Sequence, residues 1–362
     1  MTAPQVFEGL AGVLVATTEL SCVDGDRGRL LVRGRSIESL VSEVPFEAML
    51  GLLLEGAVPE PPRRADVQAE LGDARVRAHA RLWPRFAAVA APDAMTTLRS
   101  ALSLLGADAT AYDVLGMAAV ASAAWIRRER GGQLPAPEPG LPHAHDLLRL
   151  LSGGDVTAGA AQLLDAYLVT VAEHGFNAST FAARVTASTG ADLAAAVVSG
   201  VATLSGPLHG GAPGPVLDML DAVGSPARAL QFVRAELTAG RRIMGMGHRV
   251  YRVRDPRAFV LERALSAYQN GAGTSARLAL ARAVEAAAEA ELAQKYPERA
   301  LRANVEFYTA LLLEALDIPR GAFTAIFACA RCAGYAAHYA EQRRNGRLIR
   351  PSALYVGPTT SK

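Results

Sequence analysis

The sequence predicts an all-α protein of two domains with one small β-hairpin near its N-terminus. Segments with apolar residues at three- and four-residue spacing follow one another without regular intervening strands, which disfavours a doubly wound α/β fold. Alanine, the best helix former, dominates these segments. The chain has 362 residues and is 51% hydrophobic. A chain of this length and composition can bury a large core.

The hairpin is predicted from two β-prone runs, Gly12–Thr18 and Gly28–Arg33. The residues Asp24–Arg27 between them have typical turn chemistry. After Ser36 the pattern changes to a helical one, and Ser36 is a suitable N-cap for a helix that begins at Ile37.

Helices are expected through most of the remaining chain, including Leu163–Ala172 and Leu278–Leu292. The apolar run Val114–Ile126 is too short to span a bilayer and predicts a buried core helix. Proline and glycine punctuate the chain twice. Gly131–Pro142 is expected to be a surface loop, and the cluster Gly206–Pro215 a hinge.

Composition disfavours several classes of protein. Lysine plus arginine number 37 and aspartate plus glutamate 35, a net charge of +2, so no broad basic surface for nucleic acid is expected. Three cysteines cannot form a disulfide framework and suit a reducing compartment. No cationic stretch precedes an apolar run between Met1 and Leu20, so no signal peptide is expected. We therefore expect a cytoplasmic protein with neither a membrane nor a nucleic acid as partner.

Three of the seven histidines lie beside glycines and outside the helical pattern: His174, His209 and His248. Glycine lets the backbone approach a ligand closely. A single histidine of this kind would ordinarily be a loop or capping residue, but three such contexts in one chain weaken that interpretation.

Two arginine clusters are candidate anion sites. One follows His248 around Asp255-Pro256, and the other crowds the C-terminus near Arg350. Guanidinium groups match carboxylates and phosphates, although a solvated charged surface is an equal alternative. Asn304 is a candidate N-cap with Glu306 in the first turn, where a carboxylate stabilises the helix dipole by about 0.3–1 kcal/mol. A catalytic base is the other interpretation of Glu306, but this segment alone favours the role of a carboxylate that stabilises the helix dipole.

Other motifs are incomplete. Gly245-Met246-Gly247 lacks the third glycine of a dinucleotide fingerprint. The pair Cys329 and Cys332 has no second pair to complete a zinc site. His143-Ala144-His145 is followed by Asp146, but adjacent residues rarely converge on one metal. No metal site is predicted.

Taken in order, the segments G-P-L-H-G-G (206–211), G-M-G-H-R-V-Y (245–251) and N-V-E-F-Y (304–308) resemble citrate synthases. The resemblance runs from Gly9–Val13 to Arg350–Pro358 and is weakest between Val58 and Leu141. It implies a citrate-synthase-like helical fold in which residues 1–211 and 311–362 form a large domain and residues 212–310 a small one. Hinges are then expected near Gly211 and Ala310, with the site where the two domains meet.

The resemblance also implies the chemistry. His209 would hydrogen-bond the thioester carbonyl of acetyl-CoA, Glu306 would remove a proton from its methyl group, and His248 would polarise the ketone of oxaloacetate. No cofactor is implied, because acetyl-CoA is a substrate. A homodimer is implied, because Arg350 would enter the partner subunit's site. The oxaloacetate-binding residues would be His174, Arg257, Arg331 and Arg350, and the CoA-binding residues Arg242, Ile243, Met244, Gly245, Met246, Gly247 and Arg252.

One departure from the family leaves alternatives open. The family usually has aspartate at the position of Glu306, and a misplacement of about 1 Å can cost on the order of a hundredfold in rate. A non-catalytic metabolite-binding relative is therefore one alternative. A 2-methylcitrate synthase that uses propionyl-CoA is another, since one methyl group in a pocket is worth only about 1–3 kcal/mol. A metal-dependent hydrolase is disfavoured, because no H-E-x-x-H or comparable ligand set occurs.

Overall fold

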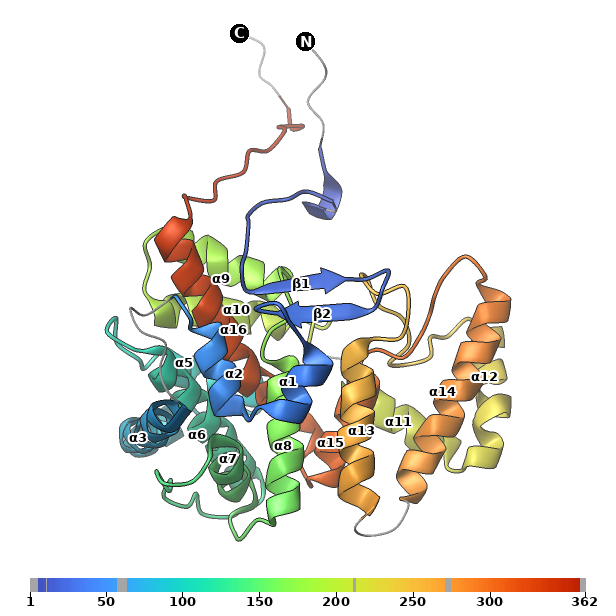
Figure 1. The fold of residues 1–362 in the computed structure, drawn as a ribbon, viewed down its shortest axis with the longest axis horizontal. Helices are drawn as coiled ribbons and strands as arrows, with labels where there is room; N and C mark the ends of the chain where they lie inside the picture. Colours follow the sequence, from blue (N-terminus) through green and yellow to red (C-terminus); the bar gives the residue numbers. More distant parts are fainter. Residues whose placement is uncertain (1–5, 11, 57–63, 211–212, 271–274, 359–362) are drawn as a thin grey trace.

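Helices make up most of the chain in the computed structural model, which describes residues 6–10, 12–56, 64–210, 213–270 and 275–358 (Figure 1). The predicted all-α class is confirmed. Short 3-10 turns lie at Glu8–Leu10, Trp83–Arg85, Pro226–Arg228 and Arg320–Ala322. The α-helices are α1 (Ile37–Glu43), α2 (Phe46–Leu53), α3 (Arg64–Leu82), α4 (Phe86–Val89), α5 (Ala94–Leu102), α6 (Ala111–Glu129), α7 (His143–Ser152), α8 (Ala158–Val171), α9 (Ala178–Ser188), α10 (Leu193–Leu204), α11 (Pro213–Val223), α12 (Ala229–Thr238), α13 (Pro256–Asn270), α14 (Ala276–Lys295), α15 (Val305–Ala315) and α16 (Phe323–Asn345).

The N-terminal sheet is antiparallel, with β1 (Ser21–Asp24), β2 (Arg29–Val32) and the short β3 (Arg35–Ser36) in sequence order. The predicted turn and second strand are confirmed. The predicted strand Gly12–Thr18 is wrong, because the strand before the turn is β1. In the pairing, Asp24 lies opposite Arg29, so only residues directly before this short connection can pair with β2.

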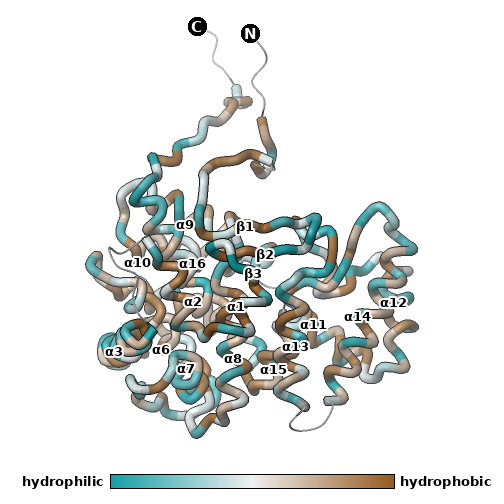
Figure 2. The backbone as a smooth tube through the Cα atoms, in the orientation of Figure 1, coloured by the Kyte–Doolittle hydropathy of each residue, from teal (hydrophilic) through white to brown (hydrophobic). Residues whose placement is uncertain are grey.

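Local signals place the helix boundaries well. The Ser36 hydroxyl accepts a hydrogen bond from the Ser39 backbone N–H (3.2 Å), so the predicted N-cap of α1 is confirmed. The predicted core helix is also confirmed, since every residue of α6 from Val114 to Ile126 is buried. Along α12 and α14, hydrophilic and hydrophobic stretches alternate as expected for helices with one face on the core (Figure 2). None of the described helices is both long and apolar enough to cross a bilayer.

The long helix α16 runs through the body and packs against α6, α8, α9 and α10. In Figure 1, α3 to α7 lie on one side and α11, α12 and α14 on the other, with α8, α13 and α15 between them. One predicted domain boundary, at 211/212, lies outside the described residues. The other, at 310/311, lies inside α15. The division into two domains stays a prediction.

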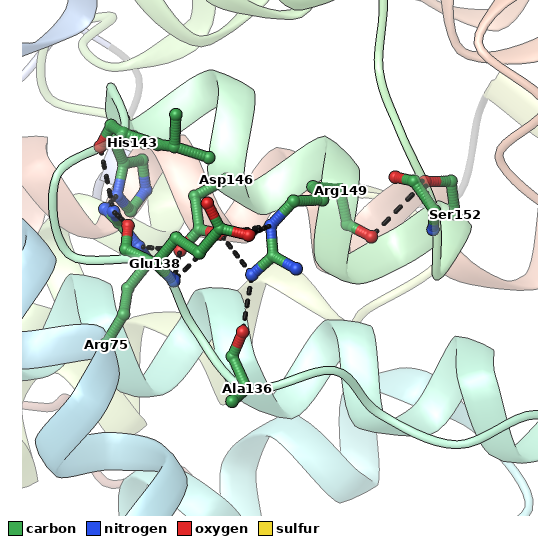
Figure 3. Close-up of polar contacts among 9 residues, drawn as sticks. Arg75, Ala136, Glu138, His143, Asp146, Arg149 and Ser152 are labelled. Atoms are coloured by element: carbon green, nitrogen blue, oxygen red, sulfur yellow. Dashed lines mark hydrogen bonds and ion pairs between the residues drawn. The ribbon is translucent and has the colours of Figure 1, made fainter.

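A buried ionic cluster anchors the loop between α6 and α7 (Figure 3). The fully buried Arg75 donates to Asp146 Oδ2 (2.6 Å), to His143 Nδ1 (3.1 Å) and to the carbonyls of Glu138 (3.2 Å) and Leu141 (3.0 Å). These contacts engage the side chains of His143 and Asp146, two residues of the His143-Ala144-His145-Asp146 segment. Among the residues described, no three histidine, cysteine or acidic side chains are grouped to hold a metal ion.

Candidate active site

Six of the predicted site residues come together, three from helices and three from loops. The rings of His174 and His248 pack edge to face, with 5.6 Å between their centroids. The charges of Arg257 and Arg331 act on the pKa of His174 and also on that of Glu306. The six residues are His174 after α8, His209 between α10 and α11, His248 in the loop before α13, Arg257 in the first turn of α13, Glu306 in the first turn of α15 and Arg331 within α16.

His174 lies at a sharp turn just after α8. Gly175 adopts a left-handed backbone conformation (φ 64°), which residues with a side chain rarely adopt. The chain therefore changes direction here after the end of α8. The Nε2 atom of His174 lies 3.1 Å from the hydroxyl of Tyr251. Burial lowers the pKa of His174 well below its usual value, and the charges of Arg257 and Arg331 lower it further. His174 is therefore neutral at physiological pH.

The proton on His248 can be assigned from its contacts. Its Nδ1 accepts hydrogen bonds from the backbone N–H groups of Val250 (3.0 Å) and Tyr251 (3.1 Å). The neutral ring therefore carries its proton on Nε2, which is left as a donor. Burial, reinforced by Arg257 and opposed by Asp255, lowers the pKa of His248 to about 4.

His209 lies in a tight turn, where its backbone N–H donates to Gly206 O (2.9 Å). Its Nε2 is 2.7 Å from the hydroxyl of Ser179, a buried residue at the start of α9. Burial, with the charges of Arg331 and Arg249, lowers the pKa of His209 to about 4. His209 and His248 are thus both neutral hydrogen-bonding groups at pH 7.

Glu306 is the second residue of α15, whose start is joined to the loop that carries His248. Asn304 caps the helix as predicted, because its Oδ1 accepts from the Glu306 N–H (3.0 Å). Its Nδ2 also donates to Gly247 O (2.9 Å), which joins the loop to the helix. Burial raises the pKa of Glu306 to about 7, helped by Asp255 and opposed by Arg257 and Arg331. A carboxylate with this pKa is suited to act as a general base near neutral pH.

The predicted CoA-binding segment 242–247 lies against the residues that lead into α15. Gly247 N–H donates to Arg302 O (2.7 Å), and Asn304 N–H donates to Gly245 O (2.9 Å). Gly245 has φ 74°, and a Cβ there would lie 2.8 Å from the ring of Phe307, so only glycine fits.

The predicted CoA-binding side chains differ in exposure. Ile243 is buried, whereas the side chains of Arg242, Met244 and Arg252 are exposed. The exposed group includes the two arginines whose charges would suit phosphate groups.

The two buried arginines have different partners. Arg257 forms a two-point ion pair with Asp255, through Nε (3.1 Å) and Nη2 (2.8 Å). Arg331 donates from Nε to Val171 O (2.8 Å), while its buried Nη2 has no partner among the described residues. A buried guanidinium nitrogen without an acceptor is costly, and an anionic ligand would supply one.

Arg350 is the one predicted oxaloacetate-binding residue that lies away from the other six. It is exposed and lines a groove of about 700 Å³ between residues 13–19 and the end of α16. The C-terminal segment leaves the body there, beside the N-terminal segment (Figure 1). Within a single chain, Arg350 is not part of the site.

Sequence reasoning missed three residues that organise the site: Ser179, Tyr251 and Asp255. Asp255 joins two helices, because it pairs with Arg257 and also accepts from the Val305 N–H (3.2 Å). Ser179 and Tyr251 lie within the same short motifs as His174 and His248, so proximity in sequence was the available signal. Cys329 and Cys332 are free and buried within α16.

Known proteins are similar to this chain over nearly its whole length. Residues 9–352 match the family described as citrate synthase, C-terminal domain. A protein named putative citrate synthase 2 from Mycobacterium tuberculosis is 42% identical over 97% of this chain and 92% of its own. A 2-methylcitrate synthase from the same species is 34% identical over 99% of this chain and 93% of its own.

Solved structures agree in fold. The crystal structure of citrate synthase from Thermotoga maritima matches with a TM-score of 0.85 and 32% identity, over 99% of this chain and 98% of that one. The chain therefore belongs to the citrate synthase family and is an enzyme of the acyltransferase type.

Proposed function

We propose that the protein is a citrate synthase, which converts acetyl-CoA, oxaloacetate and water into citrate and CoA. The observation that carries this proposal is the electrostatic arrangement of the site. A carboxyl group whose pKa is raised to about 7 shares two arginines with histidines whose pKa values are lowered. This combination suits proton removal from a weak carbon acid beside a dianionic substrate.

In the first step, Glu306 takes a proton from the methyl group of acetyl-CoA. Negative charge then develops on the thioester oxygen, where a hydrogen-bond donor stabilises it. His209 fulfils this role if the Ser179 hydroxyl turns its single proton from Asn177 Oδ1 (2.8 Å) to His209 Nε2 (2.7 Å), which leaves the proton of the neutral ring on Nδ1. A neutral donor suits this step, because it stabilises the enolate while the carboxylate remains a free base.

In the second step, the enolate carbon attacks the ketone carbon of oxaloacetate. The free Nε2–H of His248 donates a hydrogen bond to the ketone oxygen as the alkoxide forms, and the alkoxide takes up one proton in place of the one that Glu306 removed from the methyl group. Arg257, Arg331 and His174 hold the two carboxylates and orient the ketone for attack. Water then cleaves the thioester bond of citryl-CoA, and citrate and CoA leave. No metal or cofactor takes part.

We further propose that segment 242–247 and Arg252 bind CoA and that the protein is a homodimer. The exposed position of Arg350, away from its own site, supports the predicted contribution of this residue to the partner's site. An additional cation there would bring a third guanidinium group to a substrate with two carboxylates.

The preferred acyl-CoA decides between citrate and 2-methylcitrate synthesis. We expect kcat/KM for acetyl-CoA to exceed that for propionyl-CoA by about tenfold or more, since one methyl group is worth about 1–3 kcal/mol. Thiol release measured with oxaloacetate and each acyl-CoA tests this. A higher kcat/KM for propionyl-CoA would identify a 2-methylcitrate synthase. No thiol release with either substrate, together with retained oxaloacetate binding, would identify a non-catalytic relative.

The pKa of Glu306 predicts a rising pH profile. The base must be ionised, so kcat/KM for acetyl-CoA should increase between pH 6 and 8 with an inflection about 7. His209 and His248 should add no inflection in this range, because their pKa values are about 4. Rates measured with saturating oxaloacetate across this range check the prediction. A flat profile would contradict the assignment of Glu306 as the base.

A further inference from the structure

A polar network behind His174 contains two residues that the chemistry above does not use, Glu173 and His338. Arg331, Gly334, His338 and Glu341 are spaced by three or four residues and therefore share one face of α16. This face covers the C-terminal end of α8 and the residues that lead to His174. Arg331 donates to Val171 O, and His338 contacts Glu173, the neighbour of His174.

Glu173 is the centre of the network and is fully buried. Its Oε1 accepts hydrogen bonds from the Gly175 backbone N–H (2.6 Å), from the Ser21 hydroxyl (2.8 Å) and from His338 Nε2 (3.1 Å). Burial alone would raise the pKa of Glu173, but His338, Arg331 and Ser21 outweigh it, and the pKa is lowered. The group is therefore a buried anion that depends on its donors.

The orientation of His338 follows from its second contact. Its Nδ1 faces Nη1 of Arg184 at 3.1 Å. A guanidinium group only donates, so Nδ1 must accept, and the proton of the neutral ring lies on Nε2, where it donates to Glu173. Arg184 is itself held by an ion pair with Glu341 and by Gln342 Oε1 (3.0 Å), so the imidazole is fixed on both sides.

The backbone that Glu173 holds is the turn that directs His174. Gly175 is left-handed (φ 64°), and its N–H is bound by the carboxylate two residues earlier. Gly334 allows α16 to approach this turn, because a Cβ there would lie 2.5 Å from both Ala172 O and Glu173 Oε2. A change in the orientation of Glu173 therefore shifts the turn and the ring of His174 with it.

We propose that His338 is a positioning residue for oxaloacetate binding: through Glu173 it sets the turn that orients His174 toward the substrate. The proposal rests on the assignment of His174 to oxaloacetate in the proposed function. His338 does not contact the substrate in this arrangement and takes no part in proton transfer.

Two variants of similar size test the proposal. His338→Gln keeps a donor near the position of Nε2, whereas His338→Asn leaves a polar group near Arg184 and removes the donor to Glu173. We expect His338→Asn to raise KM for oxaloacetate by about tenfold, the lower range for a lost hydrogen bond to a charged group. KM for acetyl-CoA should not change. His338→Gln should restore KM for oxaloacetate to within about threefold of wild type.

Cys329→Ala provides the control for a general disturbance of α16. Cys329 lies on the face toward α6, where its Sγ is 3.3 Å from Ala118 O and from the Ser122 hydroxyl. This variant should leave both KM values unchanged. A merely structural role for His338 predicts instead a lower thermal midpoint and a lower kcat, with KM for oxaloacetate unchanged in His338→Asn. That result, or an equal rise in KM in the Gln variant, would overturn the proposal.

Calorimetric titration with oxaloacetate alone separates this proposal from the proposed function. Weaker binding by His338→Asn supports positioning even if the wild type forms no citrate, an outcome that would refute the function by itself. An active wild type with unchanged oxaloacetate affinity in His338→Asn would refute the positioning role by itself. A wild type that does not bind oxaloacetate would refute both.

Discussion

Replacing Glu306 with glutamine should lower kcat by about 10³-fold, because general-base catalysis contributes roughly 10²–10⁴ and the amide cannot accept the proton. KM for oxaloacetate should change little, since the arginines and His174 remain. Glu306→Asp should keep part of the activity, with a loss of about a hundredfold, because the carboxylate withdraws from the methyl group by about 1 Å. Thiol-release kinetics with both substrates measure these values.

Glu306→Gln should also stabilise the free protein at high pH. Burial raises the pKa of Glu306 from 4.5 to about 7. Unfolding therefore releases a proton between these values, and stability falls as pH rises from 4.5 to 7. Such a pKa shift corresponds to a loss of about 3 kcal/mol in the free energy of unfolding. Solvent around the partly exposed side chain reduces this loss to about 2 kcal/mol. Urea unfolding at pH 5 and pH 8 should show the gain in Glu306→Gln only at the higher pH.

Glu314→Gln is the matched control on the same helix. Glu314 lies on the outer part of α15 and pairs with Arg277 (2.8 and 3.0 Å), away from the six residues of the site. Its neutralisation should leave kcat unchanged. Full activity in Glu306→Gln would exclude Glu306 as the base, whereas equal losses in both variants would indicate a general effect of charge on α15.

Replacing Arg331 with methionine should raise KM for oxaloacetate by about a hundredfold, because a buried charge contact to the substrate is lost. The unpartnered Nη2 is the reason to expect a specific effect on the anion. Methionine fills a similar apolar volume. It also removes a buried guanidinium whose pKa is lowered by desolvation, so the free protein should not lose much stability.

Thermal unfolding with and without oxaloacetate checks the role of Arg331. The substrate should raise the midpoint of the wild type by mass action and leave that of Arg331→Met nearly unchanged. Arg320→Met is the control. Arg320 lies in the short turn directly before α16, the helix that carries Arg331, and it pairs with Asp218 and Asp221 on the surface. A normal oxaloacetate response in Arg331→Met would contradict its assignment as a ligand.

Local features of the fold could be predicted because they depend on neighbours in sequence. The caps at Ser36 and Asn304 bind backbone groups two or three residues later, and the turn at Asp24–Arg27 depends on its own residues. The incorrect strand at Gly12–Thr18 shows the limit. β-propensity does not specify the pairing partner, and register with β2 selected Ser21–Asp24 instead.

The sequence by itself determined the helical class, the main helices and turn, and the identity of the candidate catalytic and substrate-binding residues through their motifs. Only the tertiary structure decided their chemical states. The proton on Nε2 of His248 and the raised pKa of Glu306 depend on burial and on charges at short range. The contact of Ser179 with His209 and that of Glu173 with His338 join residues 30 and 165 positions apart. Desolvation and Coulomb interactions act through space, so no local pattern along the chain specifies them.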